Sequence, residues 1–176
     1  MKNQFDNKGN RVGYWEKYYP NGQLQSKGNY VDGKGDGYWE FYYNGQVSSK
    51  GNYEDGQQVG CWEYYYNGKL HCKGNYENGN RVGYWEYYHS NGKIWFKGNY
   101  DNKGKRVGYW KEYYPNGQLF YKGKGNYENN KRVGYWEKYH PNGQLWSKGN
   151  YENGKRVGCW ENYYSDGQLS SKTYYI

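Results

Sequence analysis

A motif that recurs about every 24 residues constrains this chain more than any other feature. Each copy contains a Trp preceded two positions earlier by Gly, and the seven Trp residues are Trp15, Trp39, Trp62, Trp85, Trp110, Trp136 and Trp160. Each Trp is followed by an Asn-Gly or Asp-Gly pair, then by Leu, Val or Ile, and in most copies by Lys-Gly-Asn-Tyr. This period predicts a tandem-repeat protein in which each repeat packs mainly on its neighbours.

The composition excludes a conventional aliphatic core. Val, Leu, Ile, Met and Cys together supply 19 of the 176 residues, and the chain contains no Ala. A content this low would by itself suggest disorder. Aromatic residues nevertheless make up 23% of the chain, and disordered chains are poor in them. We therefore expect a fold that is held together by rings.

Each repeat predicts two short antiparallel strands joined by a turn. Asn-Gly is a strong hairpin signal because a type I′ turn needs a positive φ at both central residues. A two-residue loop at residues 21–22 predicts four opposed pairs: Glu16 with Lys27, Trp15 with Gly28, Tyr19 with Leu24 and Gly13 with Tyr30. The Trp ring is expected to lie over the opposed Gly. Repeats two and three lack one residue before Asn-Gly, so a three-residue loop is expected there.

The expected fold is all-β, an elongated antiparallel β-meander of about seven hairpin repeats and about 14 strands, forming an open-ended rod or trough. Residues 1–176 are expected to form a single repeat domain. The expected repeats span residues 1–12 (partial), 13–36, 37–59, 60–82, 83–107, 108–133, 134–157 and 158–176. Strand alternation places Trp on one face of the sheet and the repeated Glu and Lys on the other.

The repeated pattern G-Y-W-E-x-Y-Y-x-N-G-x-L-x-x-K-G-x-Y-x-x-G-K-R-x-G resembles a MORN-type repeat. The resemblance is to the second variant of this repeat, found in bacterial antitoxin-like proteins and in large DNA viruses, and it covers essentially the whole chain. It implies a scaffold that binds proteins, associates with membranes or neutralises a secreted toxin. The Asn-, Lys- and Tyr-rich composition would suit an AT-rich genome, viral or bacterial.

Neither catalysis nor a metal or cofactor is expected. The chain has no H-x-x-x-H, no C-x-x-C and no Ser in a nucleophile context. His89 and His140 replace a recurring Tyr and are interpreted as structural substitutes, and His71 lies at a variable position. Cys61 and Cys72 are expected on opposite faces, so they should not pair. We therefore do not expect an enzyme.

The location expected from sequence is intracellular and cytoplasmic, meaning the host cytoplasm or the virion if the protein is viral. No apolar run approaches the 18 or so residues that a membrane span needs. The first residues lack the apolar stretch of a secretory signal. Three cysteines make no disulfide framework, which fits a reducing compartment.

Partner specificity is expected where the repeats differ, because residues repeated identically serve the architecture. The position after the Leu column carries Gln25, Ser48, His71, Trp95, Phe120, Trp146 and Ser170. The three large rings in repeats four to six are expected on the Glu/Lys face. Residues 1–88 have no net charge, whereas residues 89–176 carry the whole net charge of +8. Repeats four to six are therefore the expected contact surface, since aromatic residues and Arg are frequent interface anchors.

Part of the excess positive charge is expected along the turns, and part at a break in the Glu–Lys pairs. Lys111 replaces the repeated Glu and opposes Lys122, a pair that an anion or Glu112 would have to relieve. The expected partner-binding residues are Trp95, Phe120, Trp146, Arg106, Lys111, Lys122, Lys124, Arg132 and Arg156. In the alternative interpretation, the rings only shield neighbouring strands and the basic turns only keep the protein soluble.

The leading functional hypothesis is a non-catalytic scaffold that binds another protein or itself. Open edge strands favour self-association into a homo-oligomer, and neutralisation of a toxin is a special case of partner binding. The alternative is peripheral binding to anionic membrane lipids through the basic turns. Nucleic acid is the least favoured partner, because most Lys residues oppose a Glu, although rings interleaved with basic residues suit single strands.

Overall fold

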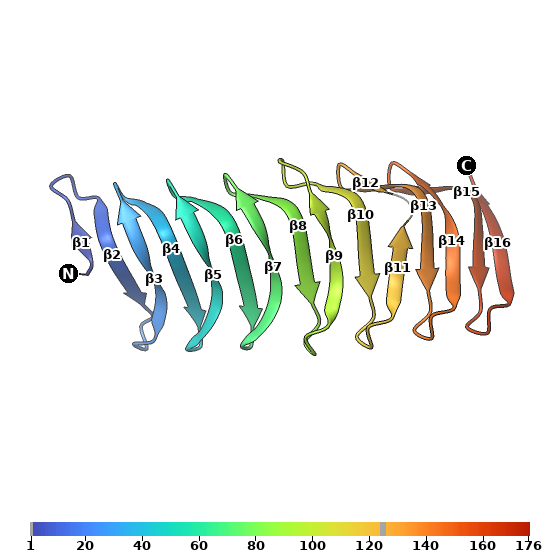
Figure 1. Ribbon diagram of the computed structural model, residues 1–176, viewed down its shortest axis with the longest axis horizontal. Helices are drawn as coiled ribbons and strands as arrows, with labels where there is room; N and C mark the ends of the chain where they lie inside the picture. The colour runs from blue at the N-terminus through green and yellow to red at the C-terminus, as the bar shows by residue number, and fades with distance from the viewer. Residues whose placement is uncertain (1, 124–125) are drawn as a thin grey trace. The chain divides into compact units, whose positions relative to one another are not determined.

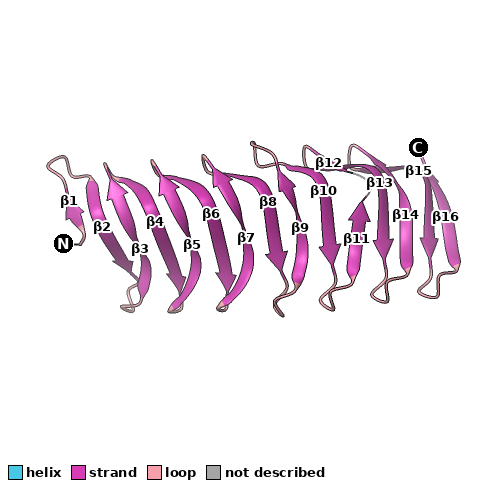
Figure 2. Ribbon diagram, viewed as in Figure 1, coloured by secondary structure: helices cyan, strands magenta, loops and turns pink. Residues whose placement is uncertain are grey.

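The computed structural model describes residues 2–123 and 126–176, and every regular element in them is a β-strand (Figures 1 and 2). These strands pair antiparallel, most of them with their neighbours in sequence. The chain divides into two compact units, residues 1–81 and 82–176, which are described separately. The predicted all-β antiparallel meander of tandem hairpins is confirmed. The described residues form 16 strands rather than about 14, because a short strand precedes the first full repeat and one strand is split.

Unit 1 contains the first seven strands, each antiparallel to the next. They are β1 (Gln4–Phe5), β2 (Arg11–Tyr18), β3 (Leu24–Val31), β4 (Lys34–Tyr43), β5 (Gln46–Glu54), β6 (Gln57–Tyr66) and β7 (Lys69–Glu77). The first two residues of the following strand, β8 (Asn80–Tyr88), belong to this unit.

Unit 2 contains the rest of β8 and the eight strands that follow. They are β9 (Ile94–Tyr100), β10 (Arg106–Tyr113), β11 (Leu119–Gly123), β12 (Asn126–Glu128), β13 (Lys131–Tyr139), β14 (Leu145–Glu152), β15 (Lys155–Tyr163) and β16 (Leu169–Tyr175). β11 and β12 both pair with β10 and β13, so together they occupy one place in the sheet.

The core of each unit is a row of tryptophans packed edge-on against tyrosines. Trp62 is 1% exposed, and its ring lies 5.1 Å from that of Tyr53 at 87°. A Cβ added to Gly51 would lie 2.4 Å from the Trp62 ring, so only glycine fits beneath it. The prediction that Trp15 covers its opposed Gly28 was wrong, because the ring over Gly28 is that of Trp39. Each such tryptophan therefore packs on the glycine of the preceding repeat and ties two repeats together.

The predicted strand register is confirmed over most of each hairpin and fails near the turn. Glu16 opposes Lys27, Trp15 opposes Gly28 and Gly13 opposes Tyr30, as predicted. Tyr18, rather than Tyr19, opposes Leu24, because the register shifts between Lys17 and Tyr18. The shift is a β-bulge, in which one strand has an extra unpaired residue.

The two kinds of hairpin turn are the reverse of the prediction. In repeat two, Asn44 (φ +50°) and Gly45 (φ +73°) form a two-residue loop between the paired residues Tyr43 and Gln46. In repeat one the loop has three residues, because Tyr19 N–H donates to the Gln23 carbonyl at 2.8 Å. The Pro-Asn-Gly sequence of that loop suits a type I turn followed by a left-handed glycine, since Pro favours the second position of such a turn.

Candidate partner-binding face of repeats four to six

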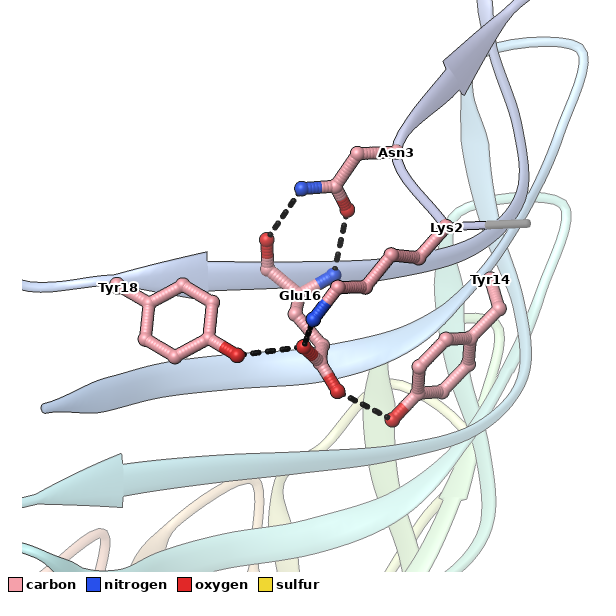
Figure 3. A network of polar contacts seen from close by, with 5 residues as sticks. All are labelled: Lys2, Asn3, Tyr14, Glu16 and Tyr18. Atoms are coloured by element: carbon pink, nitrogen blue, oxygen red, sulfur yellow. Dashed lines mark hydrogen bonds and ion pairs between the residues drawn. The ribbon is translucent and has the colours of Figure 1, made fainter.

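One face of each unit, here called the Glu/Lys face, carries a ladder of alternating charges. In unit 1 the Lys27 ammonium lies 2.6 Å from Glu40, and that of Lys50 lies 2.9 Å from Glu63. Figure 3 shows the arrangement at the first carboxylate of the ladder, where Lys2, Tyr14 and Tyr18 all donate to Glu16. These hydrogen bonds, that from Lys2 above all, lower the pKa of Glu16. Because this motif recurs along the sheet, we interpret it as part of the structure that holds the strands together.

The opposite face, called the tryptophan face, contains the position at which repeats differ most. In each hairpin the variable residue after the Leu column is the extra residue of the β-bulge. In β9, for example, Tyr87 opposes Phe96 and Tyr88 opposes Ile94, so Trp95 has no partner. The same holds for Phe120 in β11 and Trp146 in β14. No cross-strand partner constrains this position, and it carries Gln, Ser, His, Trp or Phe in different repeats.

The bulge places the three rings on the tryptophan face, and the prediction that they lie on the Glu/Lys face was wrong. Phe120 lies 5.5 Å from Tyr121 and 6.2 Å from Trp146. Trp146 stacks on His140 at 5.5 Å, and Trp95 packs on Phe96 at 4.7 Å. The extra residue reverses the alternation of side chains, which the sequence-based register did not include.

A cavity of about 260 Å³ opens on the tryptophan face of repeats four to six. Its walls include Trp95, Arg106, Trp110, Glu112, Arg132 and Trp136. Trp95 remains 38% exposed, whereas Trp110 and Trp136, which also line the cavity, are buried. Trp146 is 40% exposed and lies outside the cavity lining. The hollow thus has a rigid aromatic floor and one exposed bulge ring in its wall, that of Trp95.

The arginines lie over the tryptophan rings and do not line the turns, contrary to the prediction. The guanidinium carbon of Arg106 lies 4.3 Å from the Trp110 ring centre, and that of Arg156 lies 4.3 Å from Trp160. Arg132 lies 4.4 Å from the Tyr121 ring and donates to its hydroxyl at 3.1 Å. Arg106 donates no side-chain hydrogen bond within the described residues. Its donors are therefore available to a ligand in the cavity.

Lys138 is a part of this surface that the sequence reasoning missed. Its ammonium lies between 5.1 and 5.5 Å from the ring centres of Phe120, Tyr121 and Trp146. Burial lowers the pKa of Lys138, and the nearby Arg132 and Arg156 lower it as well. The available signal was the position two residues after Trp, which varies among repeats as strongly as the bulge position does.

Lys111, which was also predicted to bind a partner, does not join this surface. Lys111 borders the cavity, but strand alternation directs its side chain to the Glu/Lys face, where it opposes Lys97 and Lys122. Glu112 lines the cavity on the tryptophan face, so it does not offset the charge of Lys111. Lys124 lies outside the described residues.

The histidines and cysteines have structural roles or no partner within the described part of the chain. His89 Nε2 lies 2.8 Å from the Tyr113 carbonyl, and Tyr114 makes the equivalent bond to the Tyr139 carbonyl in the next repeat. His89 therefore substitutes for Tyr, as predicted. Burial raises the pKa of the Cys72 thiol to about 11, and Cys61 is exposed and unpaired.

Two kinds of site were not found in residues 2–123 and 126–176. No group of three or more His, Cys, Asp or Glu residues is arranged to hold a metal ion there. The same residues include no helix of the length and apolar character that crossing a membrane requires.

The fold and its surface define a tandem β-hairpin repeat protein. The profile described as "MORN repeat variant" matches residues 11–32, 36–55, 58–78, 81–102, 106–129, 132–153 and 156–176. The chain therefore belongs to the MORN repeat family, in its variant form. Repeats of this kind generally act as scaffolds for protein or membrane interactions.

Two crystal structures of TarM show a weak likeness to this chain. The first is 14% identical, with a TM-score of 0.30, and the match covers 67% of this chain and 21% of TarM. The second is an S. aureus TarM mutant in complex with fondaparinux, alpha-GlcNAc-glycerol and UDP; it is 10% identical with a TM-score of 0.25, and the match covers 82% of this chain and 21% of that one. The chain spans about a fifth of the length of these proteins. No curated protein sequence matches it.

Proposed function

We propose that this protein is a non-catalytic scaffold that binds another protein through the tryptophan face of repeats four to six. The observation that carries the proposal is the cavity of about 260 Å³, which combines the exposed bulge ring of Trp95 with arginines stacked on buried aromatic rings. Rings and guanidinium groups of this kind are the usual anchors of protein interfaces. The rigid floor limits the entropy lost when a partner binds.

Affinity capture from the native cell tests this proposal. The test bait carries Trp95→Ser, Phe120→Ser and Trp146→Ser together, because these rings have no cross-strand partner and their removal should leave the sheet intact. The control bait carries Tyr43→Ser and Tyr66→Ser, which remove rings that are 65% and 72% exposed in unit 1. A partner that the control and the wild type retain, and the triple variant loses, supports the proposal. Identical partner sets for all three baits contradict it.

Self-association and toxin neutralisation are two forms of the same proposal. A second copy of the chain as partner predicts a concentration-dependent mass in light scattering that the triple variant lacks. A toxin as partner predicts that purified wild-type protein inhibits the captured partner's activity and that the triple variant does not.

Anionic membrane lipids are the second candidate partner, and the positions of the basic residues favour them less. The arginines expected at the turns pack over rings instead, which leaves mainly lysines such as Lys131 and Lys155 exposed there. Flotation with anionic vesicles at low salt tests this alternative, which protein absent from the floated fraction contradicts. Vesicles without anionic lipid are the control, because each basic residue near an anionic surface contributes about 1 kcal/mol.

A further inference from the structure

The Glu/Lys face of unit 2 contains a defect that has no counterpart in unit 1. In β9, β10 and β11, which run side by side in Figure 1, Lys97 opposes Lys111 and Lys111 opposes Lys122. On either side of these three strands, the opposed residues again carry opposite charges. Glu86 opposes Lys97, and Glu137 opposes Lys122. Three adjacent strands therefore carry lysine at this position, whereas elsewhere glutamate and lysine alternate from strand to strand.

In repeats that carry Glu at this position, the contacts of its carboxylate show what the Lys111 position lacks. At Glu16 the carboxylate accepts hydrogen bonds from Lys2, Tyr14 and Tyr18 (Figure 3). Glu40 accepts equivalent bonds from Tyr38 and Tyr42 and pairs with Lys27. In both repeats, one carboxylate therefore accepts hydrogen bonds from two tyrosine hydroxyls and pairs with an ammonium group.

At Lys111 the donors are present and the carboxylate is absent. Tyr109 and Tyr113 flank Lys111 as Tyr14 and Tyr18 flank Glu16. Their hydroxyls and the Lys111 ammonium make no hydrogen bond or ion pair within the described residues. Lys97 lies on the same face, with its ammonium 5.9 Å from the Tyr113 ring centre.

The carboxylates nearest to this position are engaged or directed elsewhere. Glu86 opposes Lys97 from β8 and accepts the Tyr88 hydroxyl at 2.7 Å. Glu112 follows Lys111 in β10 but lines the cavity on the tryptophan face. Glu137 already opposes Lys148 in the next hairpin and its carboxylate accepts the Tyr139 hydroxyl at 2.6 Å. The position therefore has more hydrogen-bond donors and positive charges than its acceptors balance. Like charges opposed across strands are unfavourable.

We propose that this defect, defined by Lys97, Tyr109, Lys111 and Tyr113, binds a carboxylate group supplied from outside the chain. The incoming carboxylate takes the place of the missing Glu and accepts charge-assisted hydrogen bonds from the ammonium groups and the tyrosine hydroxyls. The group is of the kind carried by an Asp or Glu side chain of a partner protein. The proposal is independent of the proposed function, which concerns the tryptophan face.

Ligand titrations of the purified full chain test the proposal at constant ionic strength. The probes are propionate, which is the end of a Glu side chain, its neutral isostere propionamide, inorganic phosphate, and a capped peptide of three glutamates. Thermal unfolding and NMR shifts of Tyr109 and Tyr113 report binding. We expect propionate, and not propionamide, to raise Tm saturably and to shift both tyrosines. Binding of the peptide at a lower carboxylate concentration than propionate identifies a protein side chain as the ligand, whereas equal concentrations identify a free small carboxylate.

Two variants make the test specific. Lys111→Glu supplies the missing carboxylate, so we expect a higher Tm without ligand and no response to propionate. Lys103→Glu makes the same charge change at an exposed turn residue and should respond as the wild type does. A propionate response that persists in Lys111→Glu, the absence of any response in the wild type, or tighter binding of phosphate than of propionate would each overturn the proposal.

Discussion

The two units share one architecture and differ in the residues at their bulges. In unit 1 these positions carry Gln25, Ser48 and His71, whereas in unit 2 they carry Trp95, Phe120 and Trp146 before returning to Ser170. Unit 1 also has a cavity on its tryptophan face, of about 370 Å³, with Gln25 and Arg11 among its walls. A hollow over the tryptophans is therefore common to both units, and the bulge residue in its wall is the large ring of Trp95 in unit 2 but Gln25 in unit 1. The bulge allows this difference because its side chain has no partner in the sheet.

The first prediction tests whether the two units depend equally on their buried rings. Trp62→Ala in unit 1 and Trp110→Ala in unit 2 should each lower the free energy of unfolding by about 3–5 kcal/mol, because both remove a buried ring. Urea denaturation of each variant measures the loss. Trp146→Ala, which removes a ring that is 40% exposed, is the control and should cost far less. Equal losses at Trp146 and Trp110 would contradict the distinction between core and surface rings.

The second prediction concerns the glycines beneath these rings. A Cβ on Gly51 or Gly98 would lie 2.4 Å or 2.3 Å from a tryptophan ring, so Ala at either position should cost about 1–3 kcal/mol. At Gly35 the nearest atom would be 3.3 Å away, and Gly35→Ala should cost less. Thermal unfolding of the three variants measures the difference. A loss at Gly35 as large as that at Gly51 would argue against the packing of each ring on the preceding repeat.

The third prediction distinguishes the two turn types by whether Gly or Ala gives the more stable variant. At Asn44, where φ is +50°, Gly should be more stabilising than Ala by about 1 kcal/mol, because Ala resists the left-handed conformation. At Asn21, whose φ is not positive, Gly should be less stabilising than Ala by about 0.4–1 kcal/mol. The measurement is the difference in unfolding free energy between the two variants at each position. The same sign at both positions would contradict the assigned turns.

The fourth prediction concerns the charge ladder where it is intact. Hydrogen bonds from Lys172, Tyr163 and Lys148 lower the pKa of Glu161 to about 2. Because this value lies below that of the unfolded chain, the contribution of Glu161 is complete above about pH 4.3 and is lost as the pH falls towards 2. Glu161→Gln should therefore be less stable than the wild type at pH 7, and the difference should shrink as the pH approaches 2.

Urea midpoints at pH 7, 4 and 2 measure this convergence. Glu152→Gln is the control, since no ion pair is formed by this exposed glutamate in the described residues. A Glu161→Gln deficit that stays constant from pH 7 to pH 2 would show that the lost stability does not come from the ionised carboxylate.

The smallest effect is expected at the bulges themselves. Ser48→Trp in unit 1 should change the unfolding free energy by no more than about 0.5 kcal/mol, because the bulge residue has no cross-strand partner and unit 2 accommodates Trp95 and Trp146 at the same position. Chemical denaturation provides the measurement. A large loss in Ser48→Trp would mean that bulge residues in unit 1 are constrained in a way that those in unit 2 are not.

The sequence predicts most of the fold and only part of the candidate site. The repeat period and the Glu–Lys pairing determine the strands and their register, because a Glu opposite a Lys and a Trp opposite a Gly recur at fixed separations. The bulge could not be predicted from this periodicity, since an unpaired residue leaves no mark in the spacing of the paired ones. The Pro-Asn-Gly segments were a readable signal for the longer turns, because Pro cannot adopt the positive φ of a type I′ turn.

The unpredicted bulge and the packing between repeats also explain why the predicted site was partly wrong. Trp95, Phe120 and Trp146 are visible in the sequence as a variable column of rings, but their face depends on the bulge. Arg106, Arg132 and Arg156 are visible as part of a basic segment, yet only the packing shows that each lies over a ring.

The amino-acid sequence by itself determined that this chain is a stack of β-hairpins held together by rings, and that repeats four to six differ from the rest. Local spacing and residue type suffice for these conclusions because each repeat carries its own turn and strand signals. Only the tertiary structure decided which face each variable side chain occupies and which repeat each tryptophan covers. A one-residue bulge reverses the facing of a side chain, and packing between repeats depends on contacts that no single repeat contains.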